Sequence, residues 1–310
     1  MNKINSVLIA GAGAIGSTVA WQIHKTLPGS VSILAGGERL KRYAKDGFVI
    51  NGERWDFPLC AVGDSVQPNL IIVACKNHHL PAIIADMRPH VGDNTLILSL
   101  LNGISSEREL GAAFGEWRLP YAMIIGTDSG HSTNQTVFSK TGTIFFGDAV
   151  NTKPWSERVS AIKDFFDRAG VSSEVPQDMH NRLWYKYMMN VGINQITAIM
   201  RAPYRSIKTR YITDETKKLL DQAMKEVVMV AAAEGVTLSD QDIQQIYATV
   251  DTLSDEGKTS MCQDVEAGRK TEVELFSLTI RNLAAKHGIE VPVNDVFYAL
   301  LTGIESSYRT

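Results

Sequence analysis

Short apolar runs alternate with amphipathic segments over the first half of the chain. Residues 7–10, 31–34, 70–75 and 95–100 are almost wholly apolar, and residues 17–27 carry apolar side chains at helical spacing. Apolar runs of about four to eight residues are typical of parallel strands that helices cover on both faces. The pattern therefore predicts an α/β fold with a parallel sheet.

The same pattern predicts how this part of the chain continues. Residues 80–88 and 156–169 have helical periodicity, and residues 171–175 are expected to form a last strand. Residues 121–125 and 143–146 show the alternation of strands that continue the sheet, with an antiparallel pairing as one option.

Beyond residue 178 the pattern changes to helical periodicity throughout. The predicted helices cover residues 178–201, 213–234, 239–252, 260–287 and 293–307. Pro176 marks a domain boundary, because a proline neither extends a strand ladder nor permits helix in the residue before it. We expect an α/β domain over residues 1–176 and an all-α domain over residues 177–310.

The first apolar run leads directly into a loop with the spacing G-x-G-x-x-G. In a dinucleotide-binding loop Gly11 permits the tight turn, Gly13 lets the backbone approach a pyrophosphate, and Gly16 lets the following helix pack closely. The surrounding strand, helix and second strand supply the context that this fingerprint requires, although an ordinary tight turn is the alternative. The candidate cofactor residues are Gly11, Ala12, Gly13, Ala14, Ile15 and Gly16 of a Rossmann-type domain.

The sequence indicates the choice between NADP and NAD less clearly than it indicates the glycine loop. The acidic residue that would bind the ribose 2′-hydroxyl is expected about 20 residues after the loop, where Gly36 and Gly37 stand instead. One carboxylate and three cations follow, namely Glu38, Arg39, Lys41 and Arg42. Arginine binds phosphate bidentately, so NADP is favoured and NAD stays open. The alternative is that these charges form the solvated first turn of a helix.

Composition excludes several other classes of protein. The 310 residues are 44% hydrophobic and 21% charged, with a net charge of −3, which gives no basic field for nucleic acid or for an anionic membrane. Three widely spaced cysteines suggest neither a disulfide framework nor a metal site, and they fit a reduced, cytoplasmic setting. No export signal and no transmembrane run is expected.

Polar residues at two strand ends and on one helix are the candidates for chemistry. Lys76 and Asn102 each follow an apolar run, where ligands of parallel sheets bind. Lys186, Asn190 and Asn194 recur every four residues, so they form one stripe that drifts by about 40° per step and spans about 12 Å. Buried polar groups need partners, so the stripe is either an interhelical polar network or a substrate site.

Ser260 and Glu272 occur further along the chain. Ser260 with Gln263 has the spacing of a capping box, which is its structural interpretation. Within one continuous helix, Ser260 and Glu272 would lie about 18 Å apart, so both could contact one small substrate only if Ser260 precedes the helix proper or the ligand spans that gap. Glu272 could pair with Lys186 across an interdomain cleft.

These elements occur in a fixed order over nearly the whole chain. The glycine loop, Lys76, Asn102-Gly103, W-x-K-x-x-x-N-x-x-x-N from Trp184, S-M-x-x-D from Ser260 and R-x-T-E from Arg269 follow one another. Together they resemble the ketopantoate reductases of pantothenate and coenzyme A biosynthesis. The resemblance implies that Lys186 is the catalytic acid and Glu272 assists it. It further implies that Asn190, Asn194 and Ser260 bind substrate, while Lys76 and Asn102 lie at the nicotinamide end, where Asn102 orients substrate or cofactor.

The sequence departs from that family at two places. Gly36 stands where the family usually has an arginine for the 2′-phosphate, so NADP preference depends on Arg39 as a substitute. Residues 202–205, Ala-Pro-Tyr-Arg, stand where the family often has a further asparagine for the substrate. Substrate identity is therefore less firmly implied than reaction class.

The implied reaction is NADPH-dependent reduction of 2-dehydropantoate to (R)-pantoate in the cleft between the domains. Two alternatives remain at this point: a related reductase of another 2-oxo acid or of an imine-type substrate, and a regulator that binds NADP without turnover. The expected partner is a small 2-oxo acid, with no nucleic acid, membrane or metal. A homodimer is one assembly that the sequence leaves open.

Overall fold

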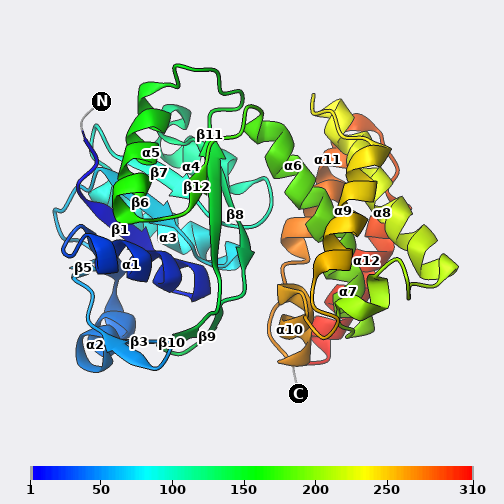
Figure 1. Ribbon diagram of the computed structural model, residues 1–310, viewed down its shortest axis with the longest axis horizontal. Helices are drawn as coiled ribbons and strands as arrows, with labels where there is room; N and C mark the ends of the chain where they lie inside the picture. The colour runs from blue at the N-terminus through cyan, green and yellow to red at the C-terminus, as the bar shows by residue number, and fades with distance from the viewer. Residues whose placement is uncertain (1–2, 309–310) are drawn as a thin grey trace. The chain divides into compact units, whose positions relative to one another are not determined.

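The computed structural model describes residues 3–308 and confirms an α/β fold followed by helices (Figure 1). Its contacts separate into two compact units, the first ending at His180 and the second beginning at Asn181. The boundary expected at Pro176 lies just before this division. Within the described residues, the strands belong to the first unit and the second unit is helical.

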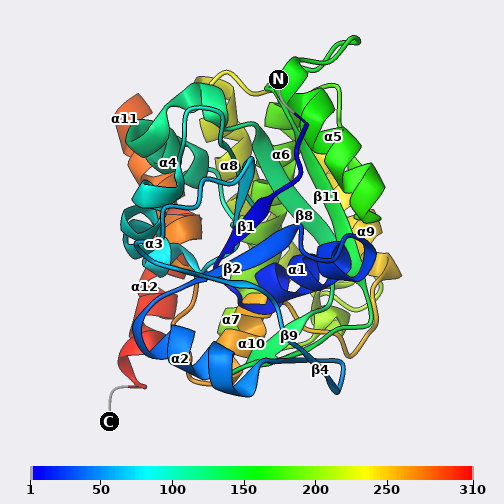
Figure 2. The same ribbon diagram turned by 90° about the vertical axis from the view of Figure 1, so that its left-hand side faces the viewer.

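Five parallel strands form the main sheet of the first unit. In spatial order they are β5 (Leu59–Ala61), β2 (Val31–Ala35), β1 (Val7–Ala10), β6 (Leu70–Val73) and β7 (Leu96–Ser99). Ile9 of β1 pairs with Ile33 on one side and with Ile72 on the other, and Figure 2 shows β1 and β2 side by side. Ile9 enters one hydrophobic core and its neighbour Leu8 enters another. Burial on both faces explains why these strands are apolar without alternation.

Helices cover both faces of this sheet. They are α1 (Ala14–Thr26), α2 (Gly37–Asp46), α3 (Leu80–Met87), α4 (Ser106–Phe114) and α5 (Glu157–Ala169), with the 3-10 turns η1 (Asn77–His79), η2 (Arg88–His90) and η3 (Glu116–Arg118). Side chains of α1 and α5 join the core that holds Ile9, whereas those of α3 and α4 join the core that holds Leu8.

The strands predicted at 121–125 and 143–146 are present, but they do not continue the main sheet. β8 (Tyr121–Thr127) and β11 (Thr141–Gly147) pair antiparallel, with Ile124 opposite Ile144. β11 also pairs parallel to β12 (Ser173–Glu174), which is shorter than the predicted strand over 171–175. These three strands form a separate sheet, so the predicted continuation was wrong.

A third, four-stranded sheet was not predicted. It contains β4 (Glu53–Trp55), β3 (Phe48–Ile50), β10 (Gln135–Val137) and β9 (Gly130–Ser132). Strands of three residues are too short to show a period. The sequence does contain one usable signal: Asn51 and Gly52 both have positive φ in the turn between β3 and β4, and Asn-Gly is typical of hairpins.

The second unit is built from helices of two kinds. The α-helices are α6 (Met179–Met189), α7 (Gln195–Met200), α8 (Asp214–Ala233), α9 (Asp240–Thr252), α10 (Ser260–Glu266), α11 (Thr279–His287) and α12 (Pro292–Ser306), with the 3-10 turn η5 (Tyr204–Ile207). Two π-helices, η4 (Asn190–Asn194) and η6 (Glu274–Leu278), precede α7 and α11.

Two predicted helices are therefore not continuous α-helices. The π-helix η4 interrupts the helix expected over residues 178–201. The helix expected over residues 260–287 is broken, because the chain leaves helical geometry between α10 and η6 and passes through Gly268 at φ +63°. Glycine tolerates this left-handed conformation at little cost.

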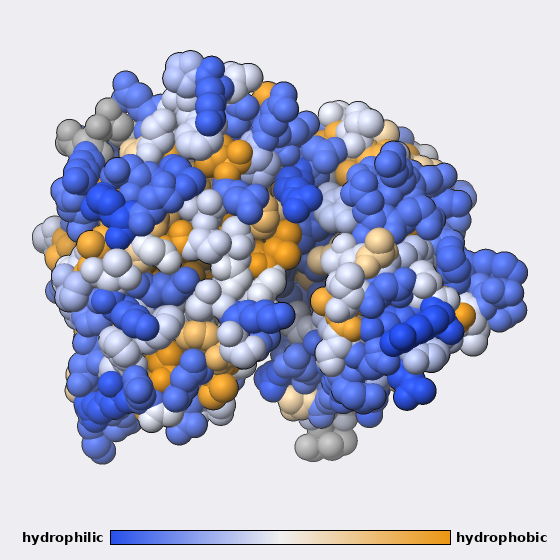
Figure 3. Space-filling view, viewed as in Figure 1, coloured by the Kyte–Doolittle hydropathy of each residue, from blue (hydrophilic) through white to orange (hydrophobic). Residues whose placement is uncertain are grey.

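The surface is mainly polar on the face shown in Figure 3, with small apolar patches on each unit. Among residues 3–308, no helix is long and apolar enough to cross a bilayer. The described residues also contain no cluster of three or more His, Cys, Asp or Glu side chains that could hold a metal ion. Cys60, Cys75 and Cys262 are free thiols.

Candidate active site

The three glycines of the phosphate loop occupy different environments. Gly11 has φ +109°, and a Cβ atom there would lie 2.7 Å from the backbone nitrogen of Cys75. A Cβ atom on Gly16 would lie 1.9 Å from the carbonyl oxygen of Gly11. These contacts agree with the turn and packing roles expected for Gly11 and Gly16. Gly13 has no heavy atom within 4 Å of its Cβ position, so its backbone faces open space.

The same loop opens α1 without a side-chain cap. The N-cap residue of α1 is Gly13, which has no side chain to cap the helix. The first turn, which contains Ala14 and Ile15, has no acidic residue. The positive end of the helix dipole is thus not neutralised by a nearby carboxylate. Backbone N–H groups and this dipole suit a phosphate group.

Lys76 and Asn102 each lie three residues after a strand, β6 and β7 respectively. Because β1, β6 and β7 are parallel neighbours, both residues lie at the same sheet edge as the glycine loop. Both are half-buried and both make contacts in the structure. Sequence reasoning missed Asn77, whose side-chain oxygen is buried and has no hydrogen-bond partner within residues 3–308. Its position immediately after Lys76 is the signal that could have identified it.

The charged residues after β2 differ in what they interact with. Lys41 pairs with Glu38 at 2.7 Å, and both side chains are exposed. Arg39 lies near the end of β6: burial raises the pKa of the Cys75 thiol to about 11, and the positive charge of Arg39 acts in the opposite direction. Cys75 borders Gly11, so Arg39 is a cation whose charge acts on a neighbour of the glycine loop.

Gly36 occupies a restricted position at the start of α2. A Cβ atom there would lie 3.1 Å from a methyl group of Val62, which is tighter than ordinary packing. A larger residue at this position would require Val62 to move. This packing gives a local reason for glycine where the family usually has arginine.

The helical unit buries the predicted polar stripe. Lys186, Asn190 and Asn194 are 8%, 4% and 8% exposed. Lys186 lies near the end of α6, while Asn190 and Asn194 are the first and last residues of η4. A π-helix has more residues per turn than an α-helix, so four residues advance through a smaller angle. The π-helix therefore opposes the drift of about 40° that an α-helix would give between Asn190 and Asn194.

Asn190 has an unsatisfied donor. Its side-chain nitrogen is buried and makes no hydrogen bond to any residue of the described chain. Burying an amide N–H without an acceptor costs about 1–3 kcal/mol, so native proteins rarely leave one unpaired without a reason. An oxygen atom of a bound ligand or of an ordered water would supply the acceptor that Asn190 lacks. Of the two interpretations of the stripe, this donor favours a substrate site over a closed polar network.

Ser260 is not the capping residue that its spacing suggested. Thr259 is the N-cap of α10 and accepts a hydrogen bond from the Cys262 N–H at 3.2 Å, so the predicted capping box was wrong. Ser260 is the first helical residue and is exposed, and its side chain makes no hydrogen bond to another described residue. The Thr259 hydroxyl also bonds the Thr197 hydroxyl at 2.8 Å, which holds the start of α10 against α7, one turn beyond Asn194.

Glu272 lies in the connection between α10 and η6 and is 8% exposed. Asp264 pairs with Arg269 at 2.8 Å and closes this connection, so these two motif residues act on the backbone conformation. The Thr271 N–H donates to a carboxylate oxygen of Glu305 in α12 at 2.7 Å, which fixes the residue before Glu272.

Lys186 and Glu272 both belong to the helical unit. The expectation that they pair across a cleft between domains is therefore corrected, as is the separation of 18 Å along one helix. α10 and η6 both pack against η4. Ser260 therefore lies on a neighbour of the π-helix that carries Asn190 and Asn194, and Glu272 lies two residues before another neighbour.

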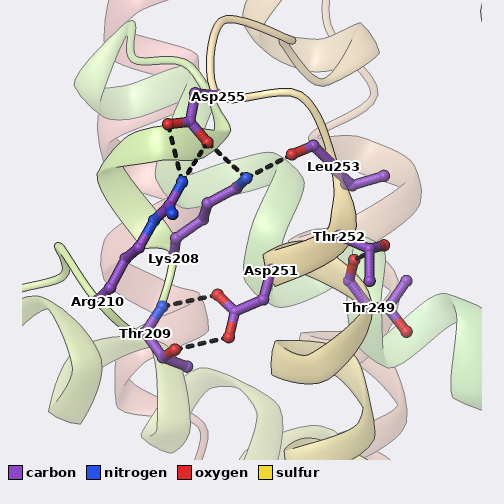
Figure 4. A network of polar contacts seen from close by, with 8 residues as sticks. All are labelled: Lys208, Thr209, Arg210, Thr249, Asp251, Thr252, Leu253 and Asp255. Atoms are coloured by element: carbon purple, nitrogen blue, oxygen red, sulfur yellow. Dashed lines mark hydrogen bonds and ion pairs between the residues drawn. The ribbon is translucent and has the colours of Figure 1, made fainter.

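The segment after α7, where the sequence departs from the family, is held firmly. Lys208 is buried and pairs with Asp255 at 2.6 Å, and Arg210 bonds the same carboxylate (Figure 4). The Tyr204 N–H donates to the Gly257 carbonyl, and the Tyr204 ring lies 3.0 Å from the position of a Cβ on Gly257. An aromatic residue thus fills the space beside a glycine, three residues before Ser260.

Comparison with known proteins identifies the family. The model of "Ketopantoate reductase PanE/ApbA" matches residues 7–151, and that of "Ketopantoate reductase PanE/ApbA C terminal" matches residues 178–305. The chain belongs to the ketopantoate reductase family. This result confirms the resemblance inferred from the ordered motifs and places the chain in a family of oxidoreductases.

Individual relatives of this ketopantoate reductase family member are distant in sequence. The chain is 27% identical to the 2-dehydropantoate 2-reductase of Pyrococcus horikoshii, covering 97% of each chain. A structure of D-mandelate dehydrogenase with NADH and anilino(oxo)acetate has a TM-score of 0.86 at 22% identity, covering 98% of this chain and 100% of that one. The dimeric ketopantoate reductase of Staphylococcus aureus has a TM-score of 0.80 at 21% identity, with 98% and 99% covered. These two structures support the fold.

Proposed function

We propose that this chain is an NADPH-dependent 2-dehydropantoate 2-reductase that forms (R)-pantoate for pantothenate and coenzyme A biosynthesis. The observation that carries the proposal is the buried, unsatisfied donor of Asn190, one turn from Lys186. A buried cation next to a donor that lacks an acceptor suits an oxygen-rich anion such as a 2-oxo acid. Family membership supplies the reaction class, and the distant relatives leave the substrate to be tested.

The first unit provides the features that a dinucleotide needs. The uncapped start of α1, from Gly11 to Gly16, would hold the pyrophosphate, and Arg39 would contact a 2′-phosphate. Lys76 and Asn102, at the ends of β6 and β7, would lie at the nicotinamide end. When bound, the reduced nicotinamide supplies the hydride that the ketone carbon accepts.

The residues of the helical unit would supply the proton and the substrate contacts. As an ammonium ion, Lys186 stabilises the negative charge that grows on the ketone oxygen and donates a proton to it. Such acid catalysis contributes about 10²–10⁴-fold to the rate. Glu272 would hold and polarise Lys186. Asn190, Asn194 and Ser260 would bind the carboxylate and the hydroxyl of the substrate.

The direct test is the decrease of NADPH absorbance when 2-dehydropantoate is added to the purified protein. Turnover that depends on both reactants, with (R)-pantoate as product, is the expected result. Binding of NADPH without turnover of any 2-oxo acid would instead identify a cofactor-sensing protein. That outcome would contradict the proposed reaction.

A second candidate, reduction of a different 2-oxo acid, is favoured by one observation. Tyr204, in the segment where the family often has an asparagine, places its ring against Gly257, three residues before Ser260. An aromatic wall favours an apolar group on the substrate. Comparing 2-dehydropantoate with 2-oxoisovalerate and with an aryl 2-oxo acid in the same assay distinguishes the two candidates.

A further inference from the structure

Two buried hydrogen bonds join the helix that carries the polar stripe to the second π-helix. The Tyr187 hydroxyl donates to the carbonyl of Phe276 at 2.7 Å. The Ser277 hydroxyl donates to the side-chain oxygen of Gln195 at 2.6 Å. Tyr187 follows Lys186 directly, and Gln195 follows Asn194 directly. Each end of the stripe is therefore tied to η6 through the residue beside it.

The backbone hydrogen bonds of both π-helices are displaced from the α-helical pattern, and in η4 a side chain takes part in the displaced pattern. In η6 the Leu278 N–H donates to the carbonyl of Val273, five residues earlier. At the end of η4 the Gln195 N–H donates to the Gly192 carbonyl. The Val191 carbonyl, four residues before Gln195, accepts instead from the Gln195 side-chain nitrogen at 2.8 Å. The side chain of Gln195 thus takes the place that its own backbone N–H has in an α-helix.

The link at Ser277 continues into a buried polar chain. Ser277 lies 3.4 Å from the side-chain oxygen of Asn294, and the Asn294 amide donates to Glu226 at 2.8 Å. Glu226 also accepts from the N–H groups of Val293 and Asn294 at the start of α12. Gln195, Ser277, Asn294 and Glu226 are all 0% exposed. Buried networks with satisfied partners are rigid, because losing any one bond leaves a desolvated group unpaired.

We propose that Tyr187 and Gln195 are positioning residues that set the two ends of the polar stripe independently. Tyr187 holds the Lys186 end through Phe276, and Gln195 holds the Asn194 end through Ser277. The inference rests on the proposed function, because it assigns proton donation to the first end and substrate binding to the second.

The two tethers should affect different kinetic constants. Tyr187→Phe removes one hydroxyl and lets Lys186 move, so we expect kcat to fall by at least about fivefold, the fold-change that one net hydrogen bond gives, with KM nearly unchanged. Ser277→Ala releases Gln195 and hence Asn194, so KM should rise by at least about fivefold with kcat nearly unchanged. A loss of general stability alone would not separate kcat from KM in this way.

The chain contains a matched control. Tyr247 of the helical unit is buried like Tyr187, at 2% exposed, and its hydroxyl donates to Asp221 at 2.7 Å. That bond joins α9 to α8 and does not involve either π-helix. Tyr247→Phe should lower Tm as much as Tyr187→Phe does while leaving kcat and KM within about twofold of the original values.

Hydrogen–deuterium exchange supplies a readout that does not depend on the reaction. Amides of residues 190–196 and 273–279 should exchange faster in Tyr187→Phe and in Ser277→Ala than in Tyr247→Phe at equal Tm. If the unmodified protein reduces no 2-oxo acid, the proposed function fails, and exchange still tests the tethers. Equal exchange in all three variants, or parallel changes in kcat and KM for both tethers, would overturn the inference.

Discussion

The glycine loop and the polar stripe are the two proposed binding sites, and they are built in different ways. In the loop the backbone forms the site, and its three glycines differ in what surrounds them: Gly11 and Gly16 are packed against backbone atoms, whereas Gly13 is open. In the stripe side chains form the site, and η4 determines the direction in which Asn190 and Asn194 point. A backbone site tolerates almost no added atoms, whereas a side-chain site depends on helical register.

The largest effect is expected in the stripe. Lys186→Ala should lower kcat by about 10²–10⁴-fold, the range for a lost general acid, because nothing else on the stripe carries a proton and a positive charge. Affinity for NADPH, measured by calorimetry, should change little, since the glycine loop lies in the other unit. A folded variant that keeps more than a tenth of the original kcat would exclude Lys186 as the acid.

The glycine loop can be dissected with a matched pair of substitutions. Gly16→Val places atoms onto the Gly11 carbonyl and should lower Tm strongly, because backbone cannot move aside cheaply. Gly13→Val adds the same side chain in open space, so Tm should be nearly unchanged while NADPH affinity falls by at least about a hundredfold through conflict with the pyrophosphate. Calorimetry and thermal unfolding of both variants provide the measurement. Wild-type NADPH affinity in Gly13→Val would remove the loop from the cofactor site.

This contrast also explains how far the sequence could predict the molecule. The loop was readable because a backbone site leaves its mark as glycines at fixed spacing, and Gly11 and Gly16 have the expected roles. The stripe was found from its four-residue spacing, but η4 was not, because no residue type signals a π-helix. Ser260 was misread for a similar reason: Thr259 and Ser260 are both capable caps, and only the backbone conformation decides between them.

Four of the five strands of the main sheet were predicted because they form apolar runs that are buried on both faces, whereas β5, with three residues, was not predicted. The strands around Phe48–Ile50 and Gly130–Ser132 were missed because three residues carry no period. The break after α10 was missed because the Asp264–Arg269 pair that closes it is a tertiary contact rather than a local pattern.

Substrate selectivity tests whether a polar side chain of the site bonds the hydroxyl group of the substrate. If a side chain bonds the 4-hydroxyl of 2-dehydropantoate, then 2-oxoisovalerate, which lacks the hydroxymethyl group, should have a kcat/KM lower by at least about a hundredfold, because a site that bonds a hydroxyl rejects an analogue without it. Parallel kinetics with the two acids provide the measurement. Equal kcat/KM values for the two acids would show that the Tyr204 segment has changed the pocket. The protein would then still be a reductase of 2-oxo acids, but 2-dehydropantoate would not be its specific substrate.

The smallest effect is expected where the backbone site meets a single side chain, at Arg39. NADPH should be preferred over NADH in kcat/KM, and Arg39→Ala should reduce that preference by about 1.5–3 kcal/mol, the range for a hydrogen bond to a charged group. Lys41→Ala is the matched control, because Lys41 already pairs with Glu38 and its removal should change the preference less. Glu38 opposes Arg39, since a carboxylate near the ribose repels a phosphate and accepts from a hydroxyl. A preference of the unmodified enzyme for NADH would therefore indicate that Glu38, rather than Arg39, contacts the ribose. It would leave the glycine loop intact as a pyrophosphate site, because that part of the site does not depend on the 2′ position.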